Sequence, residues 1–243
     1  MRKSSIAFFL MWSFLAIFIT SIELWYSYHT MYMVHNDLRC LAAEFHDMCK
    51  KESFRYWLCS GALLGSVRHG DIIKHDDDID LAVKLEDIET LKKIALIYNL
   101  QFKPAEISGV WKISKPGFCG FIDVFPVTEI NNRYSFTGMA RTLWPNETFD
   151  MDDSFDTLYA LGKYHTMTNR STFVDLVLFG PKRDAAVDYL ERAYGSSWFI
   201  PTVTHVHTLT GIRDTFFYSV CIGAVLLGLL GVQVIQCLRC KSC

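Results

Sequence analysis

The stretch GALLGSVRHGDIIKHDDDIDLAV, residues 61–83, joins a glycine-containing turn to a run of acidic and aliphatic residues. Four carboxylates fall within five positions of it, at Asp76, Asp77, Asp78 and Asp80. The alternation of acidic and aliphatic residues at its end predicts a strand that enters the core. Like charges repel one another strongly in such a place, so we expect a cation to compensate them.

Side chains of an extended strand alternate between its two faces, so Asp76, Asp78 and Asp80 are expected to converge on one face. Asp123 lies in a second apolar run, CGFIDVFPV (residues 119–127), and its carboxylate is costly to bury unless it meets a cation. A partly exposed position at a strand end is the alternative for Asp123. Hard divalent cations such as Mg²⁺ prefer oxygen ligands. The two runs therefore predict a divalent-metal site on neighbouring strands.

The turn that precedes the acids has the spacing of a strand–turn–helix–strand unit. Backbone N–H groups at the start of the helix, near Gly61, can receive a phosphate. Arg68 lies at the end of the same short helix and can contact a phosphate through its planar guanidinium. A surface position without a ligand is the alternative for Arg68.

The pattern of the remaining middle section alternates helices and strands. We expect helices over residues 36–53, with Asn36 or Asp37 as the N-cap, and over residues 62–68 and 86–99. A later helix is expected to start at Pro181 and to stop near Gly195. We expect strands near residues 55–59, 78–83, 101–103, 110–113 and 121–127. Residues 134–178 show a weak pattern, which predicts loops and short elements. The fold class is therefore α/β (α+β), a mixed sheet with flanking helices.

Both ends of the chain carry apolar runs of about 20 residues, the length of a transmembrane helix. Residues 5–26 predict a signal anchor, with a cleaved signal peptide as the alternative, and residues 215–236 predict a second span. Basic residues flank both runs, so residues 1–4 and the cysteine-rich tail, 237–243, are expected in the cytoplasm. Residues 27–214 would then form one lumenal domain.

Two sequons support passage through the secretory pathway, one at Asn146 and one at Asn169. In the oxidising lumen, disulfides are possible among the domain's four cysteines, Cys40, Cys49, Cys59 and Cys119. The net charge of −2 offers no basic surface for a nucleic acid. The two apolar runs make a membrane an expected partner, whereas the net charge argues against a nucleic acid.

The acidic stretch, the run GFIDVFPV and the segment YLERAYGSSWFIP (residues 189–201) together resemble the LicD family, which includes bacterial phosphocholine transferases and fukutin-like animal proteins. The resemblance covers most of residues 56–201. It implies a nucleotidyltransferase-type fold. The predicted spans and sequons lead us to expect this domain in a Golgi or endoplasmic reticulum membrane, on the lumenal side. The resemblance also implies transfer of phosphocholine or a polyol phosphate from a CDP-activated donor to a glycan hydroxyl, with Mg²⁺ or Mn²⁺ as cofactor.

On this resemblance, Asp78 and Asp80 match the family's paired metal aspartates, and Asp123 matches its later carboxylate. Asp76 is a further candidate ligand from the same acidic run. Candidate donor-phosphate residues are the turn glycines and two residues of the following helix, namely Gly61, Gly65, Ser66 and Arg68.

The chain departs from the family pattern at two positions. Ala62 stands where the family usually carries Ser or Thr, and His75 replaces a frequent Trp. The cysteine-rich zinc loop of the fukutin-related members is not evident. These departures motivate an alternative function, a catalytically inactive LicD-like membrane protein that binds a glycan or a partner. A calcium site in an adhesion protein is a further alternative, but the acids lack the ligand spacing of a calcium loop.

Overall fold

The computed structural model describes residues 12, 18, 19, 21, 32–74, 76–107, 109–151, 153–165 and 172–201. The chain divides into two compact units, and the elements below belong to the unit Met31–Thr202. Of the first predicted span, residues 5–26, the structure describes only four residues. The second predicted span, the tail 237–243 and the sequon at Asn169 lie outside the described residues. Within the described residues, no helix is both long and apolar enough to cross a bilayer.

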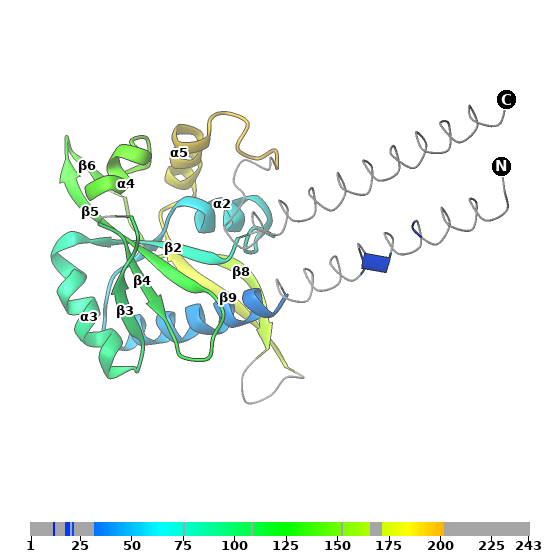
Figure 1. Ribbon diagram of the computed structural model, residues 1–243. Helices are drawn as coiled ribbons and strands as arrows, with labels where there is room; N and C mark the ends of the chain where they lie inside the picture. Colours follow the sequence, from blue (N-terminus) through cyan, green and yellow to red (C-terminus); the bar gives the residue numbers. More distant parts are fainter. Residues whose placement is uncertain are drawn as a thin grey trace, which may run out of the picture. The chain divides into compact units, whose positions relative to one another are not determined.

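The centre of the unit is a seven-stranded mixed sheet (Figure 1). Its strands are β1 (Trp57–Leu58), β2 (Asp78–Lys84), β3 (Gln101–Pro104), β4 (Trp111–Ser114), β5 (Phe121–Ile130), β6 (Arg133–Phe136) and β7 (Thr148–Asp150). The order is β1-β2-β5-β4-β3, and β6 joins β5 to β7. Strands β2 and β5 run parallel, whereas the other pairs are antiparallel. The prediction of a mixed sheet is confirmed.

Strand β2 lies between β1 and β5, and its residues between Asp80 and Lys84 are apolar on both faces. Ile79, Leu81, Ala82 and Val83 are all fully buried. A strand that is covered on both faces reads as a near-continuous apolar run, which is typical of parallel pairing. The acidic residues are therefore confined to the end of β2 where it enters the sheet.

Helices cover both sides of the sheet. They comprise residues 32–51, α2 (Ser60–His69), α3 (Ile88–Ile97), α4 (Gly138–Leu143) and α5 (Arg183–Tyr194), with a 3₁₀ turn over Leu85–Asp87. Figure 1 shows α2 and α5 on one side of the sheet and residues 32–51 on the other. Helix α2 ends at Gly70, which adopts the left-handed conformation that glycine tolerates best.

The prediction of an N-cap at Asn36 or Asp37 is wrong, because residues 32–51 are already helical on both sides of these positions. Their polar side chains serve other segments instead. Asn36 Oδ1 accepts a hydrogen bond from the His165 backbone N–H, and Asp37 Oδ2 accepts one from Cys119 N–H. Asn and Asp favour N-cap positions, but here their side chains accept hydrogen bonds from backbone groups far away in the sequence. The local sequence does not reveal such partners.

The weak pattern of residues 134–178 conceals a two-stranded sheet, β8 (Thr157–His165) and β9 (Phe173–Gly180). The strands pair antiparallel, with a register shift between Ala160 and Lys163. Gly162 lies at this irregularity with φ of +82°. The shift interrupts the period-two alternation of buried residues, and this hid the hairpin from sequence reasoning.

The described cysteines Cys40, Cys49, Cys59 and Cys119 are all free. Three of them are buried, and only Cys119 is exposed. The disulfides that an oxidising compartment would permit are therefore not formed among these four residues.

Candidate metal centre

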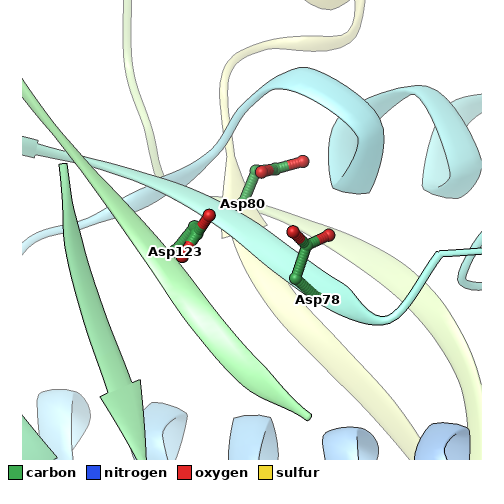
Figure 2. Close-up of side chains that lie close together, drawn as sticks. All are labelled: Asp78, Asp80 and Asp123. Carbon is green, nitrogen blue, oxygen red and sulfur yellow. The ribbon is translucent and has the colours of Figure 1, made fainter. Parts of the chain in front are cut away.

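Three aspartates meet where β2 and β5 lie side by side. The parallel register pairs Asp80 of β2 directly with Asp123 of β5, and Asp78 lies two residues before Asp80 on the same face. Each residue offers one carboxylate oxygen, and these atoms all lie within 4.8 Å of one another. Figure 2 shows the three side chains on the same face of the paired strands. We call this group the aspartate cluster.

The aspartate cluster is electrostatically unfavourable without a cation. Burial raises the pKa of Asp80 well above its usual range, and three neighbouring aspartates raise that pKa further. Only 9% of Asp80 is exposed, so water screens this repulsion poorly. Mg²⁺ and Mn²⁺ favour carboxylate oxygens, and three converging carboxylates suit them. The donor set therefore fits the predicted divalent ion.

The raised pKa of Asp80 predicts how the stability of the metal-free protein depends on pH. A carboxyl whose pKa is raised on folding contributes full stability below its ordinary pKa of 3.8, and this contribution is lost as the pH rises through the folded-state pKa. We expect the melting temperature of wild type, relative to that of Asp80→Asn, to fall as the pH rises above about 4, and added Mg²⁺ to restore that of wild type near pH 7. Thermal scans of wild type and Asp80→Asn measure the effect. Equal pH slopes in the two proteins would contradict it.

The start of α2 lies directly over the acids. Ala62 N–H donates to Asp80 Oδ2 at 3.3 Å, and Cys59 N–H donates to the Asp80 backbone carbonyl at 3.2 Å. A Cβ atom on Gly61 would lie 2.8 Å from Asp76 Oδ2 and 3.1 Å from Asp80 Oδ2. Glycine at position 61 therefore leaves room for two carboxylates, a steric role that the sequence analysis did not foresee.

Asp76 lies beside the aspartate cluster rather than within it. It is buried under the start of α2, next to Gly61, and its backbone carbonyl lies 2.8 Å from His35 Nε2. Its carboxylate is not among the three whose oxygens lie within 4.8 Å of one another. Direct metal coordination by Asp76 stays a prediction.

Three predicted phosphate-binding residues lie further along α2. A Cβ on Gly65 would lie 2.6 Å from the Asp71 carbonyl, and Ser66 Oγ donates to the Ala160 carbonyl at 2.7 Å. Both residues thus pack α2 against neighbouring segments. Arg68 lies in the last turn of α2, at the opposite end of the helix from Gly61. The structure does not bring these three residues to the aspartate cluster, and their phosphate contacts stay a prediction.

Lys112 is a site residue that sequence reasoning missed. It is the register partner of Asp123 on β4, and its Nζ lies 4.0 Å from Asp123 Oδ1. The same ammonium lies 3.5 Å from the centroid of the Phe121 ring. One positive charge therefore borders the aspartate cluster. No local signal identifies it, because the pairing of β4 with β5 is a tertiary feature.

Glu147 was also missed, because it lies within residues 134–178, whose weak pattern predicted only loops and short elements. Only 5% of Glu147 is exposed, and its Oε2 accepts hydrogen bonds from Ser60 Oγ and Tyr189 Oη. Burial raises the pKa of Glu147, while these two hydrogen bonds lower it. The preceding Asn146, the acceptor of a predicted sequon, is exposed. Asn146 and Glu147 are both polar, so the sequence gives no signal that one of them is buried.

Comparisons with known proteins concern the segment that carries this site. Residues 53–151 match the family model described as LicD/FKTN/FKRP, nucleotidyltransferase domain. "Uncharacterized protein RP689" of Rickettsia prowazekii (strain Madrid E) is 32% identical over 142 residues, which are 58% of this chain and 48% of that protein. "Ribitol 5-phosphate transferase FKRP" of Homo sapiens is 52% identical over 40 residues, which are 16% of this chain and 8% of that protein. The chain thus spans about half or less of these relatives.

Two solved structures show weaker similarity. The lincosamide antibiotic adenylyltransferase LnuA is 10% identical with a TM-score of 0.34, over 59% of this chain and 79% of that chain. ANT(2")-Ia in complex with adenylyl-2"-tobramycin is 13% identical with a TM-score of 0.35, over 86% of this chain and 98% of that chain. These TM-scores are too low to establish a shared fold.

The matched segment contains Gly61, both aspartates of β2 and Asp123, which carried most of the predicted resemblance. The third part of that resemblance, residues 189–201, lies outside the matched segment. The resemblance to this family is confirmed for the matched segment: residues 53–151 match the LicD/FKTN/FKRP nucleotidyltransferase domain.

Proposed function

We propose that this chain is a metal-dependent transferase that moves a phospho-substituent, phosphocholine or a polyol phosphate, from a CDP-activated donor to a glycan hydroxyl. The observation that carries the proposal is the convergence of Asp78, Asp80 and Asp123 within 4.8 Å under the start of α2. The family match and the partial identity to a ribitol 5-phosphate transferase support the reaction class.

The aspartate cluster would hold Mg²⁺ or Mn²⁺. Such an ion, when bound, neutralises the charge of a pyrophosphate and of its leaving group. The chain itself orients the Asp80 carboxylate through the Ala62 N–H. Lys112, beside Asp123, adds a positive charge where the donor phosphates would lie.

In the proposed reaction, the acceptor hydroxyl oxygen attacks the donor phosphorus in line with the leaving group. A new P–O bond to the glycan forms, and the P–O bond to the nucleotide breaks, which releases CMP. Asp123 either completes the metal coordination or accepts the hydroxyl proton. The phospho-substituent is therefore transferred without any change of oxidation state.

We place this activity in the lumen of the Golgi or endoplasmic reticulum. The proposal keeps residues 5–26 and 215–236 as membrane spans and residues 27–214 as the lumenal domain, on the strength of their hydropathy and basic flanks. The exposure of Asn146 in its sequon is consistent with glycosylation there.

The alanine at position 62 does not disturb the orientation of Asp80. Ala62 contributes its backbone N–H to Asp80, and that hydrogen bond needs no side-chain hydroxyl. Its side chain is buried, so the methyl group packs in the core. The lost family hydroxyl therefore leaves the orientation of Asp80 intact.

A donor screen tests the proposed function. The purified full chain is supplied with Mg²⁺ or Mn²⁺, a glycan acceptor and one donor at a time from CDP-choline, CDP-ribitol and CDP-glycerol. We expect CMP release that requires both the metal and the acceptor. Calorimetry without acceptor should show metal-dependent donor binding. Absence of CMP release together with absence of metal-dependent donor binding would contradict the proposed function and favour the inactive alternative.

A further inference from the structure

A buried carboxylate outside the aspartate cluster connects three segments of the domain. Glu147 lies just before β7, and its Oε2 accepts hydrogen bonds from Ser60 Oγ at the start of α2 and from Tyr189 Oη on α5. The Ser60 backbone N–H in turn donates to Tyr189 Oη at 2.9 Å. Ser60, Glu147 and Tyr189 therefore form a closed hydrogen-bonded ring, which we call the Glu147 ring.

The Glu147 ring is rigidly supported. Tyr189 is fully buried, and its aromatic ring stacks on Phe149 of β7 with centroids 4.4 Å apart and planes 12° apart. The hydrogen bond from Tyr189 to Glu147 is buried and the one from Ser60 is partly buried, so water weakens them less than at the surface. The position of Ser60 relative to β7 and α5 is thus set by buried contacts.

The Glu147 ring stabilises an unusual backbone conformation at Ser60. Ser60 has φ of +42°, in the left-handed region that favours glycine. Such a conformation persists only where surrounding contacts stabilise it, and here Ser60 uses both its N–H and its hydroxyl. The turn at Ser60 directs the next two residues toward Asp80. Gly61 makes the close approach, and Ala62 donates its N–H to Asp80 Oδ2.

We propose that the Glu147 ring is a positioning device for the metal centre: it holds the start of α2 against Asp80 and so orients the Asp80 carboxylate for the divalent ion. Glu147 and Tyr189 act through Ser60, Gly61 and Ala62 and are positioning residues. The proposal rests on the proposed metal-dependent function, and its tests read metal affinity and backbone protection rather than transfer alone.

Tyr189→Phe tests the proposal because it removes the ring hydroxyl and keeps the stack on Phe149. We expect the dissociation constant of Mn²⁺, measured by calorimetry on the purified full chain, to rise about 10-fold. Tyr159→Phe is the matched control, since Tyr159 is equally buried and its hydroxyl donates to the Pro181 carbonyl at 2.8 Å. We expect this control to lower thermal stability to a similar extent and to leave Mn²⁺ affinity unchanged. Equal Mn²⁺ affinity in wild type and both variants overturns the proposal.

Glu147→Gln is the second variant, and it retains the shape of the side chain. Because the ring works as a unit, Glu147→Gln combined with Tyr189→Phe should weaken Mn²⁺ binding little more than either change alone. Independent, multiplicative effects would contradict a shared mechanism. If one of the two single variants fails to fold, the Mn²⁺ affinity of the other single variant tests the proposal.

Hydrogen exchange at the Ala62 amide provides a readout that needs no metal. The Glu147 ring keeps this N–H bonded to Asp80, so its exchange should be faster in Tyr189→Phe than in wild type and unchanged in Tyr159→Phe. If wild type binds no Mn²⁺, the proposed metal function fails, and amide exchange alone decides on the ring. Wild-type protection of Ala62 in Tyr189→Phe overturns the positioning role in either case.

Discussion

Asp80→Asn is expected to lower metal-dependent transfer about 1,000-fold or more and to raise the melting temperature of the metal-free protein at pH 7. The first effect follows because Asp80 lies between Asp78 and Asp123 and contributes a ligand oxygen to the aspartate cluster. A 1,000-fold loss corresponds to roughly 4 kcal/mol of transition-state stabilisation, the scale of a lost metal contact. The second effect follows because asparagine removes a buried charge whose ionisation opposes folding. CMP release and thermal scans without metal measure the two effects.

Asp77→Asn is the matched control for Asp80→Asn. It removes the same charge from the same acidic run, and Asp77 is not one of the three residues of the aspartate cluster. We expect its transfer rate to stay close to wild type. Similar losses in both variants would show that the net charge of the run matters and that the geometry of the cluster does not.

Gly61→Ala is expected to lower transfer about 100-fold and to weaken Mn²⁺ binding. The added Cβ would meet Asp76 Oδ2 at 2.8 Å and Asp80 Oδ2 at 3.1 Å, and both carboxylates would have to move. Displacement of a catalytic group by about 1 Å can cost about 100-fold in rate. The contacted atoms are side-chain termini, so the fold can accommodate the change better than the site can. Mn²⁺ calorimetry and CMP release measure the loss.

Gly65→Ala separates this effect from general overpacking of α2. Its Cβ would lie 2.6 Å from the backbone carbonyl of Asp71, which cannot rotate away as a side chain can. We therefore expect the free energy of unfolding to drop by about 1–3 kcal/mol, with the folded protein retaining its Mn²⁺ affinity. A Gly61→Ala protein that loses stability as severely as Gly65→Ala while binding Mn²⁺ normally would refute the steric role of Gly61.

The aspartate cluster was predictable because its signal is local and physical. Alternation along a strand places Asp78 and Asp80 on one face whatever the rest of the chain does. An isolated carboxylate in the apolar run around Asp123 is costly to bury, which marked it as a partner. The parallel register that pairs Asp80 with Asp123 then brings the two signals together.

Other predictions failed where contacts between distant segments overrode the local preference of the residues. Asn36 and Asp37 are good N-cap residues, yet they lie inside a helix and accept hydrogen bonds from distant backbone groups. The bulge near Gly162 broke the alternation by which β8 would have been recognised. In both places, the decisive contact joins residues more than 80 positions apart or depends on an irregular register.

The amino-acid sequence by itself determined which strand carries the acids and the mixed α/β class, because periodicity and burial cost act over a few neighbouring residues. The similarity of residues 53–151 to the LicD family was also visible in the sequence, through motifs rather than through periodicity. Only the tertiary structure decided that Lys112 borders Asp123 and that Glu147 and Tyr189 hold Ser60. These contacts depend on which strands pair and on how α5 packs against α2. That choice is made by the whole core at once, since no short segment contains both partners.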